Sequence, residues 1–155
     1  MQLFFLLPVL LCASSSPRLS LEDLVSQSDT IVAGHVVRTW TAMDSENRFI
    51  WTHYEIKIDS TLKGQAEANV VVGEPGGTLK GVSLLVRGST PYTLGEEVSV
   101  FLYRTPIGYL RTTNYGQGKF VISADRRIQS LGGMSWIDFR SRIVRVVASH
   151  QEVRP

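Results

Sequence analysis

Three histidines, His35, His53 and His150, are the side chains best suited to metal binding or proton transfer in this chain. His35 and His53 lie on two successive runs typical of strands, so their side chains could face each other. Glu55 follows His53 by two residues and shares its face of the strand, which makes a third ligand conceivable. The chain has no H-x-x-x-H, H-E-x-x-H or C-x-x-C spacing, however. We therefore expect strand-surface histidines, with no metal site and no cofactor.

Other residues capable of catalysis are present but do not form a known catalytic pattern. Serine is common, yet no G-x-S-x-G nucleophile elbow occurs. The acidic pairs at 22–23 and 96–97 fit a helix start and a loop end. The glycine clusters at 73–77 and 116–119 lack the Lys-Ser/Thr ending of a phosphate-binding loop. The sequence thus predicts no catalytic residue. A hydrolase with a cryptic site would need a pocket where His53 and Glu55 meet a third polar group.

Two segments are predicted as binding loops, because binding residues concentrate on loops held by a rigid scaffold. They run from 74 to 80 and from 114 to 119. Trp40, Trp51 and Tyr54 could form a stacking platform for nucleic acid, but cross-strand packing explains them more simply, and nucleic acid is not expected as a partner of an exported protein. The candidate contact residues of the two loops are Glu74, Pro75, Gly76, Gly77, Lys80, Asn114, Tyr115, Gln117 and Lys119.

The amino terminus has the pattern of an export signal. Residues 3–13 form an apolar run too short to cross roughly 30 Å of hydrocarbon, which needs about 20 residues. We predict a signal peptide over residues 1–16, cleaved near Ala13 to Ser16, with a short membrane anchor as the alternative. Cys12 could carry a lipid, although Leu11 stands where a lipobox has a small residue. The mature chain is expected to be secreted or periplasmic and to have no transmembrane segment.

The composition is that of one globular domain. The 155 residues are 43% hydrophobic and 19% charged, which is too apolar for a disordered chain. A single cysteine excludes an internal disulfide and a four-thiolate zinc site. The net charge is +2, and the residues from 104 onward are markedly basic. A solvated basic face is the favoured interpretation, and a surface for anionic partners is the alternative.

Hydrophobic periodicity predicts a mainly β domain between two helices. A short helix begins at Ser20, which forms a capping box with Asp23. Gly34 indicates a bend, a bulge or a close backbone approach within the first strand. Strands this short, separated by turn residues, favour a small barrel or sandwich. The runs typical of strands are 30–40, 49–62, 69–73, 81–87, 98–103, 109–112 and 120–122.

A closing amphipathic helix is predicted from about Trp136 to Ser149, with Ser135 as its cap. The predicted organisation is therefore a β domain with its short helix over 17–131, and an amphipathic helix and tail over 132–155 that pack on it. The alternative for this helix is a basic amphipathic surface element that meets a membrane or a partner.

Six motifs occur in a moderately specific order over residues 19 to about 124. They are Leu-Ser-Leu-Glu-Asp-Leu-Val at 19–25, Ser-Asp-Thr-Ile-Val-Ala-Gly-His-Val at 28–36, Leu-Lys-Gly at 62–64, Pro-Gly-Gly at 75–77, Gly-Glu-Glu-Val with Phe-Leu-Tyr in 95–103, and Gly-Gln-Gly-Lys-Phe at 116–120. Together they resemble an uncharacterised domain of secreted bacterial proteins that sometimes precedes metallopeptidase modules. The order is also similar to the netrin-like shape of tissue inhibitors of metalloproteinases. This resemblance implies a small antiparallel OB-like barrel with flanking N-terminal and C-terminal helices.

One difference from those inhibitors matters for function. The resemblance implies an amino-terminal cysteine that chelates the protease zinc, and the expected mature chain has no cysteine. The fold can carry over without that mechanism. The expected function is an exported, non-enzymatic binding module for an unknown protein or envelope component. A protease inhibitor or protease-regulating domain is the alternative, and a cryptic hydrolase is the second alternative.

Overall fold

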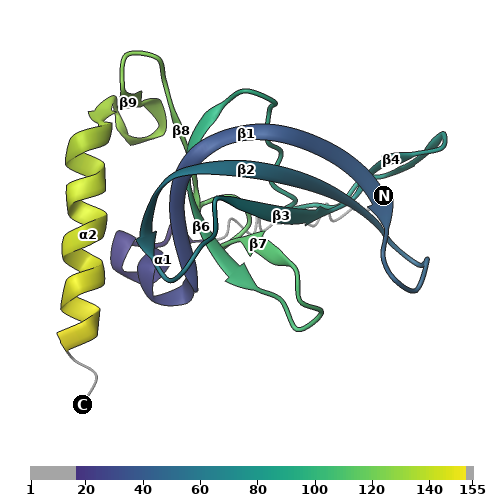
Figure 1. Ribbon diagram of the computed structural model, residues 1–155, viewed down its shortest axis with the longest axis horizontal. Helices are drawn as coiled ribbons and strands as arrows, with labels where there is room; N and C mark the ends of the chain where they lie inside the picture. Colours follow the sequence, from purple (N-terminus) through teal and green to yellow (C-terminus); the bar gives the residue numbers. More distant parts are fainter. Residues whose placement is uncertain (1–16, 153–155) are drawn as a thin grey trace, which may run out of the picture.

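The computed structural model describes residues 17–152, a mainly β structure with an α-helix near each end of that range (Figure 1). The predicted signal peptide and its cleavage site lie outside the described residues, as does the end of the predicted tail, residues 153–155. The helical elements are α1 (Leu21–Gln27), the short 3-10 helix η1 (Gln129–Leu131) and α2 (Trp136–Glu152).

The main sheet has six strands in the order β1-β2-β3-β7-β6-β8, and β1 also pairs with β6. All of these pairings are antiparallel except the short one between β3 and β7, through Val72 and Leu110. Its strands are β1 (Thr30–Met43), β2 (Ile50–Lys63), β3 (Asn69–Pro75), β6 (Glu97–Arg104), β7 (Leu110–Thr112) and β8 (Lys119–Ile122). Two small hairpins add β4 (Gly77–Leu79) with β5 (Val82–Leu84), and β9 (Arg127–Ile128) with β10 (Met134–Ser135).

Both predicted helix caps are confirmed. The backbone N–H of Asp23 donates to Ser20 Oγ over 3.0 Å, and the Ser20 N–H donates back to the Asp23 carboxylate over 3.3 Å. At the second helix, the Asp138 N–H donates to Ser135 Oγ over 3.1 Å. These side chains satisfy N–H groups that the first helical turn cannot pair.

Strands β1 and β2 are long and strongly curved, and they arch over the rest of the sheet (Figure 1). Their pairing shifts register at three places, one of them between Ala33 and Gly34. A Cβ atom built on Gly34 would lie only 2.0 Å from the backbone oxygen of Lys57. The prediction for Gly34 is therefore confirmed: it permits a close backbone approach, and the irregularity lets the first half of β1 pair with both β2 and β6.

Side chains from the inner face of the curved sheet form one of two hydrophobic clusters. Tyr92, from the connection before β6, reaches into it, and its hydroxyl lies 2.6 Å from Thr112 Oγ1. Burial raises the pKa of Tyr92 far above its usual value, so the hydroxyl remains protonated and available as a donor. The buried members of this inner cluster are Val32, Val36, Ile56, Val70, Val72, Tyr92, Val98, Val100 and Leu102.

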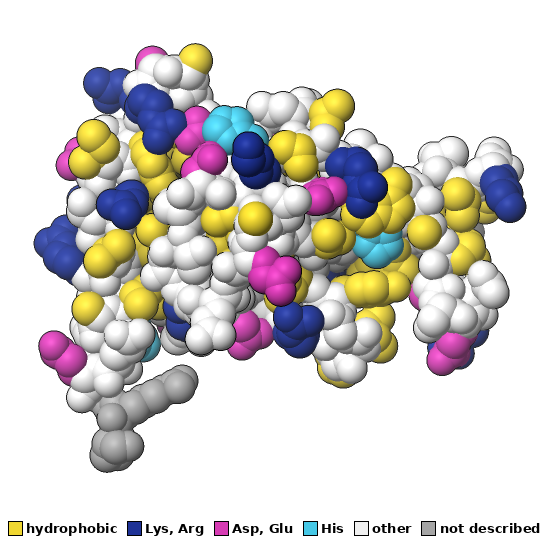
Figure 2. Space-filling model, in the orientation of Figure 1, with side chains coloured by type: hydrophobic (Ala, Val, Ile, Leu, Met, Phe, Trp, Pro, Cys, Tyr) yellow, Lys and Arg dark blue, Asp and Glu magenta, His cyan; other side chains and the backbone are white. Residues whose placement is uncertain are grey.

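The second cluster lies between the outer face of the sheet and the two helices. Helix α2 buries Trp136, Phe139, Ile143 and Val147, as its periodicity predicts, and these pack with side chains of α1, β1, β6 and β8. The apolar face of α2 is thus covered by the domain itself. Its opposite face carries exposed arginines, and Figure 2 shows basic side chains spread along this side of the molecule.

The prediction that residues 74–77 form a turn or loop is wrong. Glu74 and Pro75 end β3, Gly76 is buried, and Gly77 begins β4. Proline is tolerated because Pro75 is the last residue of its strand and pairs only with Trp51 of β2. The strand predicted at 81–87 is shorter than expected, because only Val82–Leu84 pairs, with β4.

The described residues contain no helix with both the length and the apolar composition that crossing a bilayer requires.

Candidate functional site

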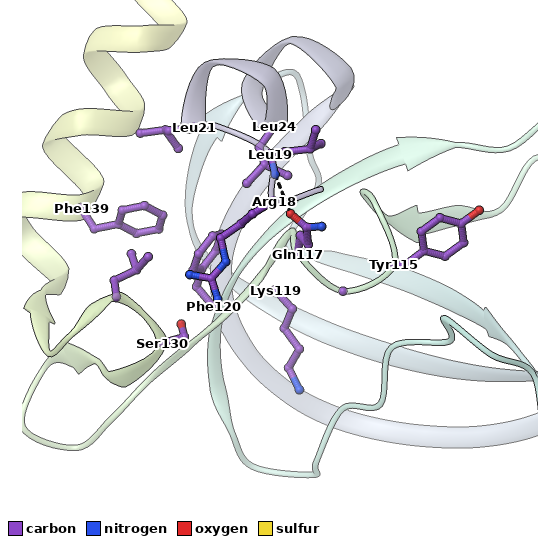
Figure 3. Close-up of a pocket in the computed structure, with 12 residues that line it drawn as sticks. Arg18, Leu19, Leu21, Leu24, Tyr115, Gln117, Lys119, Phe120, Ser130 and Phe139 are labelled. Atoms are coloured by element: carbon purple, nitrogen blue, oxygen red, sulfur yellow. Dashed lines mark hydrogen bonds between the residues drawn. The ribbon is translucent and has the colours of Figure 1, made fainter. Parts of the chain in front are cut away.

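A pocket of about 370 Å³ opens between α1, the turn before β8, η1 and α2 (Figure 3). Its walls come from both ends of the described chain and from the second predicted binding loop. Figure 3 shows Leu21 and Phe139 approaching each other from the two helices, with Phe120 beside them. The apolar lining consists of Leu19, Leu21, Leu24, Phe120, Leu131 and Phe139, and the other lining residues are Arg18, Tyr115, Gly116, Gln117, Lys119 and Ser130.

The turn over 114–118 is confirmed, and its backbone conformation holds one wall of the pocket. Asn114 and Tyr115 both have positive φ, at 49° and 51°. A Cβ atom on Gly116 would lie 3.1 Å from Thr90 Oγ1, which leaves little room for any other residue. The turn is therefore packed directly against the connection that precedes β6.

Gln117 ties the start of the described chain to this turn. Its side-chain oxygen accepts from the Leu19 N–H over 2.8 Å, and its Nε2 donates to the Pro17 carbonyl over 3.1 Å. These bonds position Arg18 and Leu19 at the pocket. The sequence prediction placed Gln117 on a contact surface, whereas the structure uses its side chain to build the wall.

Lys119 directs its charge away from the pocket (Figure 3). Its Nζ lies 2.5 Å from Glu96, donates to the Pro91 carbonyl over 2.6 Å and stands 4.5 Å from the centre of the Tyr92 ring. Arg18 forms no ion pair within residues 17–152 and is exposed. Arg18 is thus the cation that remains available at the mouth of the pocket.

Residues 74–76 of the first predicted binding segment are buried, which corrects the assignment of this part as a surface loop. Glu74 is only 1% exposed. Its carboxylate accepts from the backbone N–H of Thr112 over 2.9 Å and of Thr90 over 3.3 Å, and it pairs with Arg111 at 3.2 Å. Lys80 alone fits the prediction well, because it lies exposed in the turn between β4 and β5. Glu74 therefore organises the two segments around it and is not accessible to a partner.

His35 and His53 do not face each other. His35 stands opposite Lys57 in the strand pairing, and His53 stands opposite Trp40. His53 is 8% exposed, stacks on Trp40 at 5.2 Å and meets the Tyr109 ring edge-on at 5.4 Å. Neither His53 nor its neighbour on the same face, Glu55, lines the pocket described above.

The aromatic residues considered as a stacking platform pack within the fold. Trp40 lies between His53 and the Arg38 guanidinium, which is 4.4 Å from the ring centre. Trp51 packs on Tyr109 at 4.7 Å. Tyr54 packs instead on Tyr92, at 4.9 Å. The three therefore do not share one open platform, and Trp40 and His53 form the cross-strand pair that the packing interpretation predicts.

Burial lowers the pKa of His53 below its usual 6.5. The unfolded chain then binds a proton more readily than the folded chain, so the free energy of unfolding falls as the pH drops below about 6.5 and levels off below the folded pKa. We expect His53→Phe, which keeps a ring against Trp40, to weaken this decline between about pH 7.5 and pH 5. Urea unfolding at several pH values measures it, with His150→Gln as control. An equally steep decline in wild type and His53→Phe would contradict the assignment.

One polar cluster was not predicted from the sequence: His35, Asp59 and Glu97 come together from three neighbouring strands. The alternation of side chains along β2 places Asp59 on the outer face of the sheet, and this position can be predicted from the sequence. The pairing of β1 with β6, which brings in Glu97, is not visible in the sequence.

No protein-family model matches this chain, and no curated protein matches it either.

Proposed function

We propose that this chain is an exported, non-enzymatic binding module on an OB-like barrel, and that its pocket takes an apolar side chain of a partner protein. Export is inferred from the signal-peptide pattern of residues 1–16. The partner is either a protein in solution or a protein component of the cell envelope.

The strand pairings support the barrel. The pairs run from β1 through β2, β3, β7 and β6, and the pairing of β6 with β1 returns the series to its start. An OB-type barrel has five strands arranged in a Greek key. The inner cluster fills the concave side of these strands with valines and other apolar side chains, which leaves ligand binding to the outside of the proposed barrel.

The observation that carries the binding proposal is the pocket between the two helices. Its six leucine and phenylalanine side chains offer an apolar lining of the kind that receives a partner's anchor residue. Arg18 at its mouth would favour an acidic group beside that anchor. Because the pocket walls are held by α1, α2 and the Gln117 hydrogen bonds, the site is formed before a partner arrives.

The test is affinity capture from the secreted or periplasmic fraction, with the retained proteins identified by mass spectrometry. Ser130→Trp is designed to fill the pocket from the exposed η1, and Arg18→Glu reverses the charge at its mouth. Ile107→Ser is the control, because Ile107 is a 65% exposed apolar residue outside the pocket lining. We expect the same partner with wild type and Ile107→Ser, and its loss with both pocket variants. Unchanged capture by the pocket variants would reject the site.

A further inference from the structure

His35, Asp59 and Glu97 project from β1, β2 and β6 toward one point on the outer face of the sheet. One ligand-type atom from each residue lies within 4.8 Å of the other two. His35 Nδ1 is 2.8 Å from Asp59 Oδ2, and His35 Nε2 is 3.9 Å from Glu97 Oε2. The Asp59 and His35 side chains are about half exposed and that of Glu97 is 20% exposed, so an ion from solvent can reach the cluster.

The backbone beneath the cluster is held on both sides. His35 and Glu97 are direct partners in the pairing of β1 with β6, so their Cα atoms stand opposite each other. On the other side, Gly34 lets β1 approach the backbone of Lys57 and Ile58 closely, immediately beside Asp59. Three donors on paired strands are placed more precisely than three donors on loops.

The positively charged side chains near the cluster leave its carboxylates able to bind a cation. Arg126 pairs with the Oε1 atom of Glu97, which leaves Oε2 directed at His35. Lys57 stands opposite His35 in the pairing but forms no ion pair with Asp59 or Glu97. Two carboxylates thus share one imidazole and one guanidinium, and Arg126 orients Glu97 for binding through a single oxygen.

We propose that His35, Asp59 and Glu97 bind one divalent transition-metal ion of the zinc type. One imidazole nitrogen and two carboxylate oxygens are ligands that such ions accept, at about 2.0–2.2 Å from the metal. Ligands at tetrahedral angles are then about 3.4 Å apart. Because Asp59 now faces His35 Nδ1 and Glu97 faces His35 Nε2, the side chains must rotate on binding so that both carboxylates meet one ring nitrogen. Calcium needs more oxygen ligands than the cluster offers, and magnesium prefers carboxylate and water oxygens to an imidazole nitrogen. Three protein ligands leave one coordination position for water or for a partner's side chain.

The test is calorimetric titration of zinc into the full-length chain carrying Cys12→Ser and no histidine tag, so that neither the one cysteine nor a tag binds the ion. We expect one saturable site that calcium and magnesium do not occupy. His35→Gln, Asp59→Asn and Glu97→Gln should each weaken zinc binding about tenfold or more. His150→Gln is the matched control, because it removes an exposed histidine elsewhere, and it should leave the affinity unchanged.

A second measurement does not depend on how the variants fold. Zinc added to the protein without substitutions in the cluster should shift the amide NMR signals of residues 34–36, 58–60 and 96–98. No saturable binding, equal affinity in the three cluster variants, or shifts centred elsewhere would overturn the proposal, and the cluster would then be a set of cross-strand ion pairs only. The test uses zinc alone, so its outcome is independent of the proposed partner binding.

Discussion

Replacing Glu74 by alanine is expected to lower the free energy of unfolding by about 3–5 kcal/mol. The carboxylate is almost completely buried and accepts from two buried backbone N–H groups, those of Thr90 and Thr112, while it pairs with Arg111. Alanine would leave both N–H groups without an acceptor and a largely buried guanidinium without its counter-charge. Urea or guanidinium denaturation followed by circular dichroism measures the loss.

Two further variants separate the parts of this effect. Glu74→Gln keeps an acceptor oxygen and removes the charge, so we expect a smaller loss of about 1–3 kcal/mol. Glu67→Ala is the control, because Glu67 is exposed in the connection before β3, and it should change stability by no more than about 0.5 kcal/mol. A loss below about 1 kcal/mol for Glu74→Ala would show that its buried contacts are not required for stability.

The second large effect is expected for Phe139→Ala, at about 3–5 kcal/mol. Phe139 is 3% exposed and is the ring at which the outer cluster converges. Its centroid lies 4.7 Å from Phe120, 6.4 Å from Phe101 and 6.5 Å from Trp136. Truncation removes these contacts and extends the pocket into the cluster, because Phe139 also lines the pocket. The same denaturation measurement applies.

Ile137→Ala provides the matched control on the same helix. Ile137 is 73% exposed, so its truncation should cost no more than about 0.5 kcal/mol. Similar losses for the two variants would mean that Phe139 contributes no more packing than the exposed Ile137, and would contradict the docking of α2 on the sheet, because alanine is the better helix former at both positions. A large loss confined to Phe139→Ala supports a helix that is part of the domain's core.

Local patterns in the sequence were enough to place both helices. A cap requires only that Ser20 and Asp23, or Ser135 and Asp138, stand three residues apart, and the apolar face of α2 follows from its helical period. The turn at 114–118 was likewise predicted from its own residues. These features depend on contacts within a few residues, and such contacts are fixed by the sequence alone.

The alternation of β2 was a weaker guide. It correctly separates buried Ile56 from exposed Lys57, yet it places Trp51 and His53 on the same side as Lys57, and both are buried. Tyr109, which immediately precedes β7, packs against both of these rings. Periodicity describes which face a side chain occupies, but it does not reveal what covers that face.

Glu74, a predicted binding residue, shows the same limit of local sequence patterns. The sequence Gly-Glu-Pro-Gly-Gly is typical of a turn, and it was interpreted as a surface loop. The parallel contact between β3 and β7 instead brings Arg111 and Thr112 to the carboxylate. A carboxylate this deeply buried is stable only with such partners. The order of the strands in the sheet decides which residues lie beside it.

The residues of this chain by themselves determine a mainly β domain, two capped helices and the turn before β8. Tertiary structure alone decided that the pocket lies between α1, α2 and that turn, that Glu74 is internal, and that His35 meets Asp59 and Glu97. The physical reason is the range of the interactions. Caps, turns and periodicity are local, whereas each of these three arrangements joins residues that only the pairing of distant strands and the docking of α2 bring together.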